Sequence, residues 1–373
     1  MANKKSDREF FEIGFDDVTI TKLDLYERYL QEWLPVPLSG RMGVREAAIY
    51  DLFCGPGKDS KGQAGSPLRA KNVVFANRET ILRSHVPLRM VFNDYDEQHV
   101  SSLSALLGND LHTKSGESLA TVEYYSSAFD DIFPHLLEQM TSDAANMLFI
   151  DQFGATAIDE DRFRDLHSLK RTDVLFFISS NWFWRFVGRP EATEWNVTKE
   201  DLSQIQYKHV HRFMANHFRQ LVGDEYFVAP FSLKKGSNIY GMIFASHDTL
   251  GLEKFLKVAW EKDPHTGEAD YDIDDDGLDD PNQVLLFEPK KVASFRDDLR
   301  ERIRNKEFKT DCDIYIHMLQ SGFLNKHTKD VVMEFASKSA GFMEFQNEKG
   351  RRMQCRLSRD TIREPRAIVY SDL

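Results

Sequence analysis

The sequence has few cysteines, and they are widely spaced. Cys54, Cys312 and Cys355 are the only three in 373 residues. Such spacing offers neither a disulfide framework nor a cluster of metal ligands, and it fits a protein kept in a reducing compartment. The sequence therefore predicts no metal site.

Long apolar runs are also missing. No uninterrupted run approaches the roughly 20 residues that a membrane helix needs. Residues 1–7 include two lysines and lack the apolar segment of a secretory signal peptide. With 41% hydrophobic and 29% charged residues, the composition is that of an ordinary globular protein, long enough for two domains. We expect a cytoplasmic protein.

Basic residues are fewer than acidic residues overall, but the difference is not even along the chain. The formal net charge is −12, which argues against a chain that coats nucleic acid along its whole surface. Residues 286–373 nevertheless carry 18 Lys and Arg against 14 Asp and Glu, whereas residues 1–285 carry 30 against 46. Any contact with a polyanion is therefore expected at the C-terminal end.

The stretch from Ile49 to Gly57 is the most informative part of the chain. An apolar run ends in Asp51 and passes into a turn that contains Gly55 and Gly57. Buried strands of open α/β sheets lead into cofactor-binding loops in this way, and Ser66-Pro67 then signals the start of a helix. The pattern indicates a pocket for a nucleoside-bearing cofactor. A tight strand-to-helix turn without a ligand is the alternative.

Further apolar runs predict the rest of the sheet. Residues 88–92, 146–150 and 174–179 read as strands, and uninterrupted runs are typical of parallel strands covered by helices on both faces. Asp94 follows the first of them, where an acid often holds a ribose; the alternative is a turn residue or a helix N-cap. Residues 226–246 read as an antiparallel hairpin at one edge.

The predicted domain order has four parts. Residues 1–47 form a helical cap, in which the helix over residues 19–33 stops before Pro35. Residues 48–262 form an α/β domain with a doubly wound, Rossmann-like sheet. An acidic linker or loop follows over residues 263–283. Residues 284–373 form a small α-rich domain, with a winged helix as one candidate architecture.

Four ordered motifs resemble the three-Cys-motif partner protein family, TcmP. They are residues 51–57, 65–68, 151–154 and 239–260. That family is similar to class I S-adenosylmethionine-dependent methyltransferases, whose seven-stranded sheet ends in an antiparallel hairpin. The resemblance implies S-adenosylmethionine as cofactor. It also implies a partner protein with a three-cysteine motif, similar to radical-SAM iron–sulfur proteins, and any cluster would belong to that partner.

The resemblance also implies roles for individual residues. Asp51, Gly55 and Gly57 would line the methionine end of the cofactor, and Phe53 of the same loop is included among the cofactor-binding residues. Asp94 would hold the ribose. An acid that often contacts adenine is not evident after the third strand, where Ser127 stands as the candidate instead.

Asp151 and Phe153 are the candidate catalytic residues. The resemblance places Asp151 where the transferred methyl emerges, and Gln152 replaces the proline common in the family. Asp151 would hold a substrate amine and Phe153 would stack on a planar substrate. The alternative is that Asp151 caps a helix and Phe153 packs in the core.

Two readings of the function remain open. Methylation at cytosine C5 needs a nucleophilic cysteine, usually after proline, and no cysteine here follows proline, so we exclude it. The leading reading is a methyltransferase-like protein acting on nucleic acid together with the three-cysteine partner. The alternative is a methyltransferase-shaped subunit that holds a partner protein or nucleotide and catalyses nothing.

Overall fold

The computed structural model describes residues 14–152, 157–187, 197–223, 225–277, 287–337 and 341–371. The chain forms two compact units, Met1–Lys254 and Phe255–Leu373. The domain boundaries expected from the sequence, after residues 47, 262 and 283, stay predictions.

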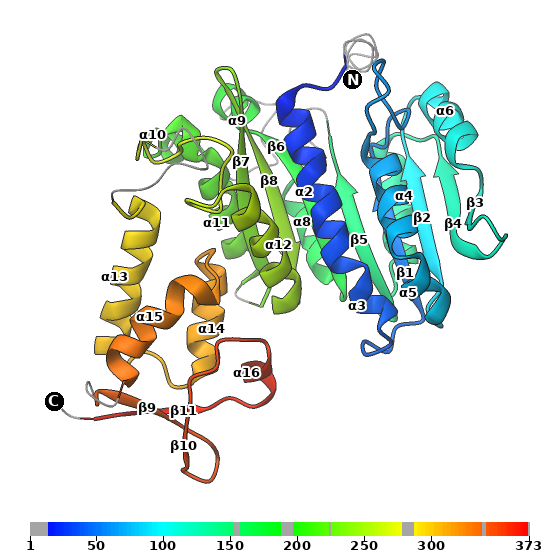
Figure 1. Cartoon of the computed structure of the whole chain (residues 1–373). Helices are drawn as coiled ribbons and strands as arrows, with labels where there is room; N and C mark the ends of the chain where they lie inside the picture. The colour runs from blue at the N-terminus through cyan, green and yellow to red at the C-terminus, as the bar shows by residue number, and fades with distance from the viewer. Residues whose placement is uncertain are drawn as a thin grey trace. The chain divides into compact units, whose positions relative to one another are not determined.

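The first unit contains an eight-stranded sheet with the order β3-β4-β2-β1-β5-β6-β8-β7 (Figure 1). Five of its strands are parallel: β1 (Glu46–Asp51), β2 (Leu88–Asn93), β4 (Ser118–Tyr125), β5 (Ala144–Ile150) and β6 (Thr172–Ser179). β7 (Phe227–Lys235) and β8 (Asn238–Ser246) form the expected antiparallel hairpin, and β8 pairs with β6. The short strand β3 (Asp110–His112) was not predicted; it lies antiparallel beside β4. The fold class is confirmed: a Rossmann-like methyltransferase sheet with an antiparallel edge hairpin.

Helices cover both faces of this sheet, as uninterrupted apolar strands require. All seven residues of β5 are buried. The helices of the first unit are α2 (Asp17–Trp33), α3 (Pro35–Leu38), α4 (Ser66–Ala76), α5 (Arg78–Arg83), α6 (Glu97–Leu107), α7 (Phe129–Gln139), α8 (Glu160–Ser168), α9 (Ser180–Phe186), α10 (Lys199–Ser203) and α11 (Val210–Val222). The helix α12 (Thr249–Lys262) runs from the first unit into the second.

The long helix α2 begins and ends where its sequence signals predict. The carboxylate of Asp16 accepts a hydrogen bond from the backbone N–H of Thr19 and caps the first turn. Proline at position 35 then ends the helix and begins the short α3. Arg69 of α4 pairs with Asp24 and Glu27, which fixes α2 against α4. The face of α2 that is buried includes a lysine and two tyrosines, Lys22, Tyr26 and Tyr29.

The second unit is α-rich, as expected. Its helices are α13 (Lys290–Arg304), α14 (Asp311–Gln320), α15 (Asn325–Ala336) and the short α16 (Asp360–Arg363). Its strands β9 (Met343–Gln346), β10 (Arg352–Met353) and β11 (Ala367–Tyr370) form an antiparallel sheet with the order β10-β9-β11. Three helices precede the β-hairpin, and β11 lies beside β9. The winged helix stays a prediction for this unit.

No helix among the described residues is both long enough and apolar enough to cross a bilayer.

Candidate functional site

The carboxyl ends of β1 and β5 meet at the centre of the sheet. The chain places β2 and β4 on one side of β1 and then returns to place β5 on its other side, so the strand order reverses between β1 and β5. Open α/β sheets bind ligands at such a reversal, outside the carboxyl ends of the strands. Asp51 ends β1 and Asp151 follows β5, so the two predicted acids flank the reversal.

Asp51 is a fully buried carboxylate with spare hydrogen-bonding capacity. Its Oδ1 accepts a bond of 3.4 Å from the backbone N–H of Phe53, while its Oδ2 has no partner among the described residues. Burial, together with the charges of the nearby Asp151 and Asp94, raises the pKa of Asp51 to about 7 against the opposing effects of Ser66 and the backbone N–H of Phe53. A buried carboxylate of this kind favours a cationic donor as its partner.

Tyr26 of α2 places a second polar group near Asp51. Its ring stacks on Phe149 of β5, with 4.2 Å between the ring centroids. Its buried hydroxyl oxygen also has no partner among the described residues. Burial raises the pKa of Tyr26 well above its ordinary value, and the charge of Asp51 adds to the effect. Two buried polar groups are therefore available at this edge of the sheet.

Asp94 fixes the backbone of the glycine loop through a hydrogen bond. Gly55 adopts a φ of +58°, and its backbone N–H donates to Asp94 Oδ2 over 3.0 Å. Asp94 Oδ1 accepts from the backbone N–H of Asp96 over 2.8 Å and lies 3.2 Å from Nδ1 of His99. A carboxylate offers about four lone-pair sites. Asp94 thus fixes the loop and retains room for one further donor, such as a ribose hydroxyl.

Asn93 joins the ends of three strands beneath this loop. Its side-chain amide donates to the carbonyls of Leu52 and Ser127, and its Oδ1 accepts from the backbone N–H of Ser127. The structure thus brings Ser127 beside the cofactor loop through its backbone. Phe53 stacks on Phe129 at the start of α7, with 5.3 Å between centroids. Both predicted residues lie at the same edge as Asp51.

Cys54 lies in the middle of the loop and is buried. Burial raises the pKa of its thiol well above the ordinary value, and Asp51 and Asp94 reinforce the shift. A nucleophilic cysteine requires the opposite environment, one that favours the thiolate. The structure agrees with the exclusion of a cysteine nucleophile drawn from the sequence.

Asp151 is paired with a residue that the sequence analysis missed. Lys22 Nζ lies 2.5 Å from Asp151 Oδ2, and the two side chains are 9% and 20% exposed. The same ammonium lies 4.8 Å from the ring centroid of Phe177. A lysine on the buried face of the amphipathic helix over residues 19–33 was the available signal, but it does not identify a partner more than a hundred residues away.

Gln152, which stands where the family resemblance implies a proline, forms two hydrogen bonds through its side chain. Its Nε2 donates to the carbonyl of Phe177 over 2.9 Å, and its Oε1 accepts from the backbone N–H of Ala157. The first bond ties the chain after β5 to β6, and the second ties it to the segment before α8. Phe153, the other catalytic candidate, lies outside the described residues.

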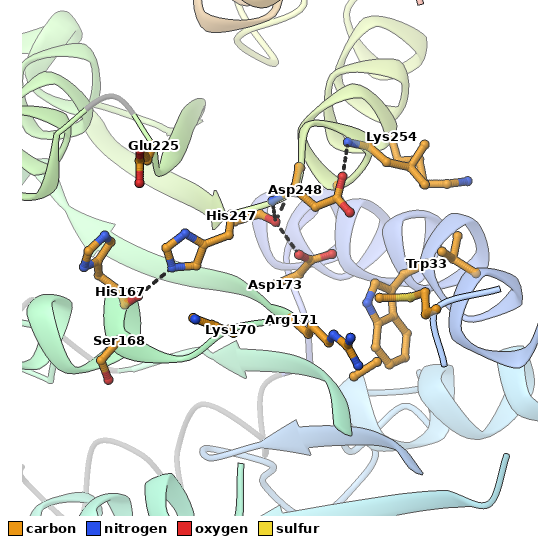
Figure 2. Close-up of a pocket in the computed structure, with 16 residues that line it drawn as sticks. Trp33, His167, Ser168, Lys170, Arg171, Asp173, Glu225, His247, Asp248 and Lys254 are labelled. Carbon is orange, nitrogen blue, oxygen red and sulfur yellow. Dashed lines mark hydrogen bonds between the residues drawn. The ribbon is translucent and has the colours of Figure 1, made fainter. Parts of the chain in front are cut away.

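A cavity of about 580 Å³ lies at the opposite edge of the sheet, where β5 and β6 begin (Figure 2). Asp173 of β6 lines it and accepts hydrogen bonds of 2.5 Å from the hydroxyls of Tyr29 and Ser246. Burial raises the pKa of Asp173 to about 6 despite these two donors. Its position at the amino ends of the strands separates this cavity from the predicted cofactor edge.

Comparison with known proteins gives structural neighbours of low similarity. A mutant form of a 16S rRNA (adenine(1408)-N(1))-methyltransferase from Catenulisporales acidiphilia matches with a TM-score of 0.29 and 13% identity, covering 57% of this chain and 90% of its own. The methyltransferase domain of bacterial CtHen1-C matches with a TM-score of 0.29 and 10% identity, covering 59% and 98%. No family model matches the sequence, and no curated protein matches it. The fold assignment therefore rests on the strand order itself.

Among the described residues, no group of three or more His, Cys, Asp or Glu side chains is arranged to hold a metal ion.

Proposed function

We propose that the chain binds S-adenosylmethionine at the carboxyl edge of β1 and acts as a methyltransferase on nucleic acid, together with a three-cysteine iron–sulfur partner. The observation that carries the cofactor assignment is the buried Oδ2 of Asp51, which has no partner among the described residues. The amine of the cofactor's methionine moiety is a cationic donor of the kind that this oxygen favours.

The described residues fit such a cofactor in three respects. Asp51 would bind the amine, the loop of Gly55 and Gly57 allows close approach of the backbone, and Asp94 retains capacity for a ribose hydroxyl. Phe53 and Ser127 lie beside this loop and would complete the pocket. When bound, S-adenosylmethionine supplies a methyl group activated by a sulfonium.

Asp151 would position the substrate. It stands across the strand reversal from Asp51, and its carboxylate can accept a hydrogen bond from an exocyclic amine and orient the nitrogen lone pair. Phe153, two positions on, would stack on a planar base. The nucleic-acid substrate and the partner protein rest on the family resemblance and on the excess of basic residues near the C-terminus.

A specific observation favours the alternative of a binding subunit without catalysis. Asp151 Oδ2 is engaged by the ammonium of Lys22. A substrate amine would have to share or displace this cation. If the ion pair persists when substrate binds, the site would retain a nucleotide or partner but not orient an acceptor nitrogen.

Calorimetry with S-adenosylmethionine tests the cofactor site. The Asp51→Asn variant keeps the shape of the side chain and removes its charge, and we expect its affinity to fall at least about tenfold. Asp110→Asn, at an exposed position of β3, is the matched control and should bind as the native protein does. Native protein that shows no binding at millimolar cofactor would overturn the proposal.

Transfer of a labelled methyl group separates the two readings. Native protein with its three-cysteine partner would be incubated with RNA, DNA and protein acceptors, and the label followed into each. We expect transfer to a nucleic acid and its loss in Asp151→Asn with cofactor binding retained. Cofactor binding without transfer to any acceptor would support the binding subunit.

A further inference from the structure

The second unit contains a helix-turn-helix. The helices α14 and α15 are joined by four residues, 321–324. Gly322 in this turn adopts a φ of +83°, and the next residue, Phe323, is buried. A capping box between Thr310 and Asp313 fixes the start of α14. Two helices joined by a short turn that contains glycine are typical of DNA-binding units, in which the second helix contacts the groove.

The helix α15 presents one buried and one exposed side. Thr328, Val331 and Val332 are buried against the unit. The exposed positions on the other side of the helix are Asn325, Lys326, Lys329 and Met333, together with the acids Asp330 and Glu334. Met333, with 44% of its surface exposed, adds an apolar residue to this side of the helix.

The hairpin that follows adds a second basic element. β9 and β10 are joined by a tight turn in which Asn347 Oδ1 accepts from the backbone N–H groups of Lys349 and Arg351. Gly350 completes the turn with a φ of +69°. Lys349, Arg351 and Arg352 are exposed. A long side chain of the hairpin also reaches α15, because Arg352 Nη2 donates to the carbonyl of Ala336.

Arg352 of the hairpin lies 3.8 Å from Glu344 Oε2, but three other cations of α15 and the hairpin differ from those of α13 in their partners. On α13, Arg300 pairs with Glu334 and Arg302 pairs with Asp298. Within the described residues, the side chains of Lys329, Lys349 and Arg351 form no ion pair with an acid. Their charge is therefore available to an external anion.

Positive charge also gathers at the start of α15. Lys326 Nζ lies 5.2 Å from the ring centroid of Trp260, and that indole lies against His327 with 3.9 Å between centroids. Burial, together with the charges of Lys326, Arg296 and Lys291, lowers the pKa of His327 to about 3. Lys291 and Arg296 are themselves paired with Glu268 and Glu288, so Lys326 is the cation that this turn adds to the exposed side.

We propose that the basic face formed by Lys326 and Lys329 of α15 and by residues 349–352 of the hairpin binds double-stranded DNA. The helix would enter the major groove and the hairpin would contact the adjacent backbone. The major groove of B-form DNA is about 12 Å wide and admits an α-helix. The major groove of A-form RNA is too deep and narrow for side chains to read. The geometry therefore points to DNA and not to an RNA duplex.

This inference deepens the proposed function, and it rests on that function only for the idea that bound DNA is presented to the methyl-transfer site. Binding itself depends on the second unit alone. The charge balance agrees, since residues 286–373 carry an excess of basic residues and the rest of the chain is acidic.

Fluorescence anisotropy on the full chain tests the basic face. The probe is a labelled DNA duplex of about two helical turns, compared with an RNA duplex of the same sequence. We expect Lys326→Glu with Lys329→Glu to weaken DNA binding at least about tenfold and to reduce the slope of log affinity against log salt by about 2, since each lost phosphate contact contributes about 0.9. Lys114→Glu with Lys170→Glu, two exposed lysines of the first unit, is the charge-matched control.

The control variant should lose less than about threefold in affinity for DNA, which is the change expected from net charge without a direct contact. Equal losses in the two double variants, equal affinity for the RNA duplex, or no binding of native protein at low salt would each overturn the inference. Calorimetry with S-adenosylmethionine on the same variants keeps this result separate from the proposed function. DNA binding without cofactor binding would support the DNA-binding face and reject the cofactor site. Cofactor binding without DNA binding would support the cofactor site and reject the DNA-binding face.

Discussion

The side-chain ammonium of Lys22 lies 2.5 Å from the carboxylate of Asp151. The pair joins helix α2 to the residue after β5, at the point where the strand order of the sheet reverses. Because both side chains are mostly buried, the attraction between them is screened less than at a surface. The N-terminal helix is therefore a part of the candidate site as well as a cover for the sheet.

A double-mutant cycle will measure this ion pair. With Lys22→Met, Asp151→Asn and both together, we expect a coupling energy of about 1 to 3 kcal/mol in the free energy of unfolding. The exposed pair Arg83 and Glu79, 3.6 Å apart, is the control, and its coupling should be no more than about 0.5 kcal/mol. Urea-induced unfolding gives all the values. Equal coupling in the two pairs would contradict a structural role for Lys22.

The buried carboxylate of Asp51 predicts a pH-dependent effect on stability. Its pKa is about 7 in the folded chain against an ordinary value of 3.8. The folded state therefore holds this proton more tightly than the unfolded state, and the stability linked to it is lost as the pH rises towards 7. Asn at this position has no proton to lose. Relative to native protein, we expect Asp51→Asn to gain about 2 to 3 kcal/mol between pH 5 and pH 8.

Urea titrations of both proteins at pH 5, 6, 7 and 8 follow this difference. Asp110→Asn, at the exposed first position of β3, should show no such trend. Cofactor binding should have the opposite dependence, with affinity for S-adenosylmethionine higher at pH 8 than at pH 6, because only the ionised carboxylate attracts its amine. A flat difference between Asp51→Asn and native protein would mean that Asp51 is already ionised at pH 5.

The fold could be predicted because its signals are local. Four of the five parallel strands contain a short apolar run, whereas β4 does not; Asp51 ends β1, and Asp94 and Asp151 directly follow β2 and β5. Parallel strands end at one edge of the sheet, so strand ends in the sequence become neighbours in space. β3 was not predicted, because a three-residue strand at the edge of the sheet has too few residues to show a periodic pattern.

The hydrogen bonds and ion pairs of the site could not be predicted in the same way. The bond from Gly55 to Asp94 and the pair of Lys22 with Asp151 join segments that no periodicity relates. A lysine and a tyrosine on a helix are ordinary residues in sequence terms. Their burial beside two carboxylates depends on how α2 packs against the sheet, which is a tertiary property.

The two hydrogen bonds of Gln152 lead to a third prediction. Gln152→Ala would leave the carbonyl of Phe177 and the N–H of Ala157 without their side-chain partner. We expect a loss of about 1 to 3 kcal/mol in the free energy of unfolding. Gln98→Ala, at an exposed position in the first turn of α6, should stay within about 0.5 kcal/mol of native protein. Equal stability of the two variants would show that water replaces the lost bonds.

Alanine substitutions at Gly57 and Gly62 distinguish the cost of backbone strain from the cost of close packing. Gly57 and Gly62 adopt φ values of +88° and +81°, so alanine is strained at both. A Cβ at Gly57 would lie 2.8 Å from Cδ1 of Leu103, whereas a Cβ at Gly62 meets no atom within 4 Å. We expect each alanine to cost about 1 kcal/mol for the backbone, and Gly57→Ala to cost about a further 1 kcal/mol for displacing the buried Leu103. Chemical unfolding of both variants, and of Gly57→Ala combined with Leu103→Ala, measures the second contribution. Because Leu103→Ala removes the obstructing atom, the cost of Gly57→Ala in that background should fall to that of Gly62→Ala; an unchanged cost would place the strain in the backbone alone.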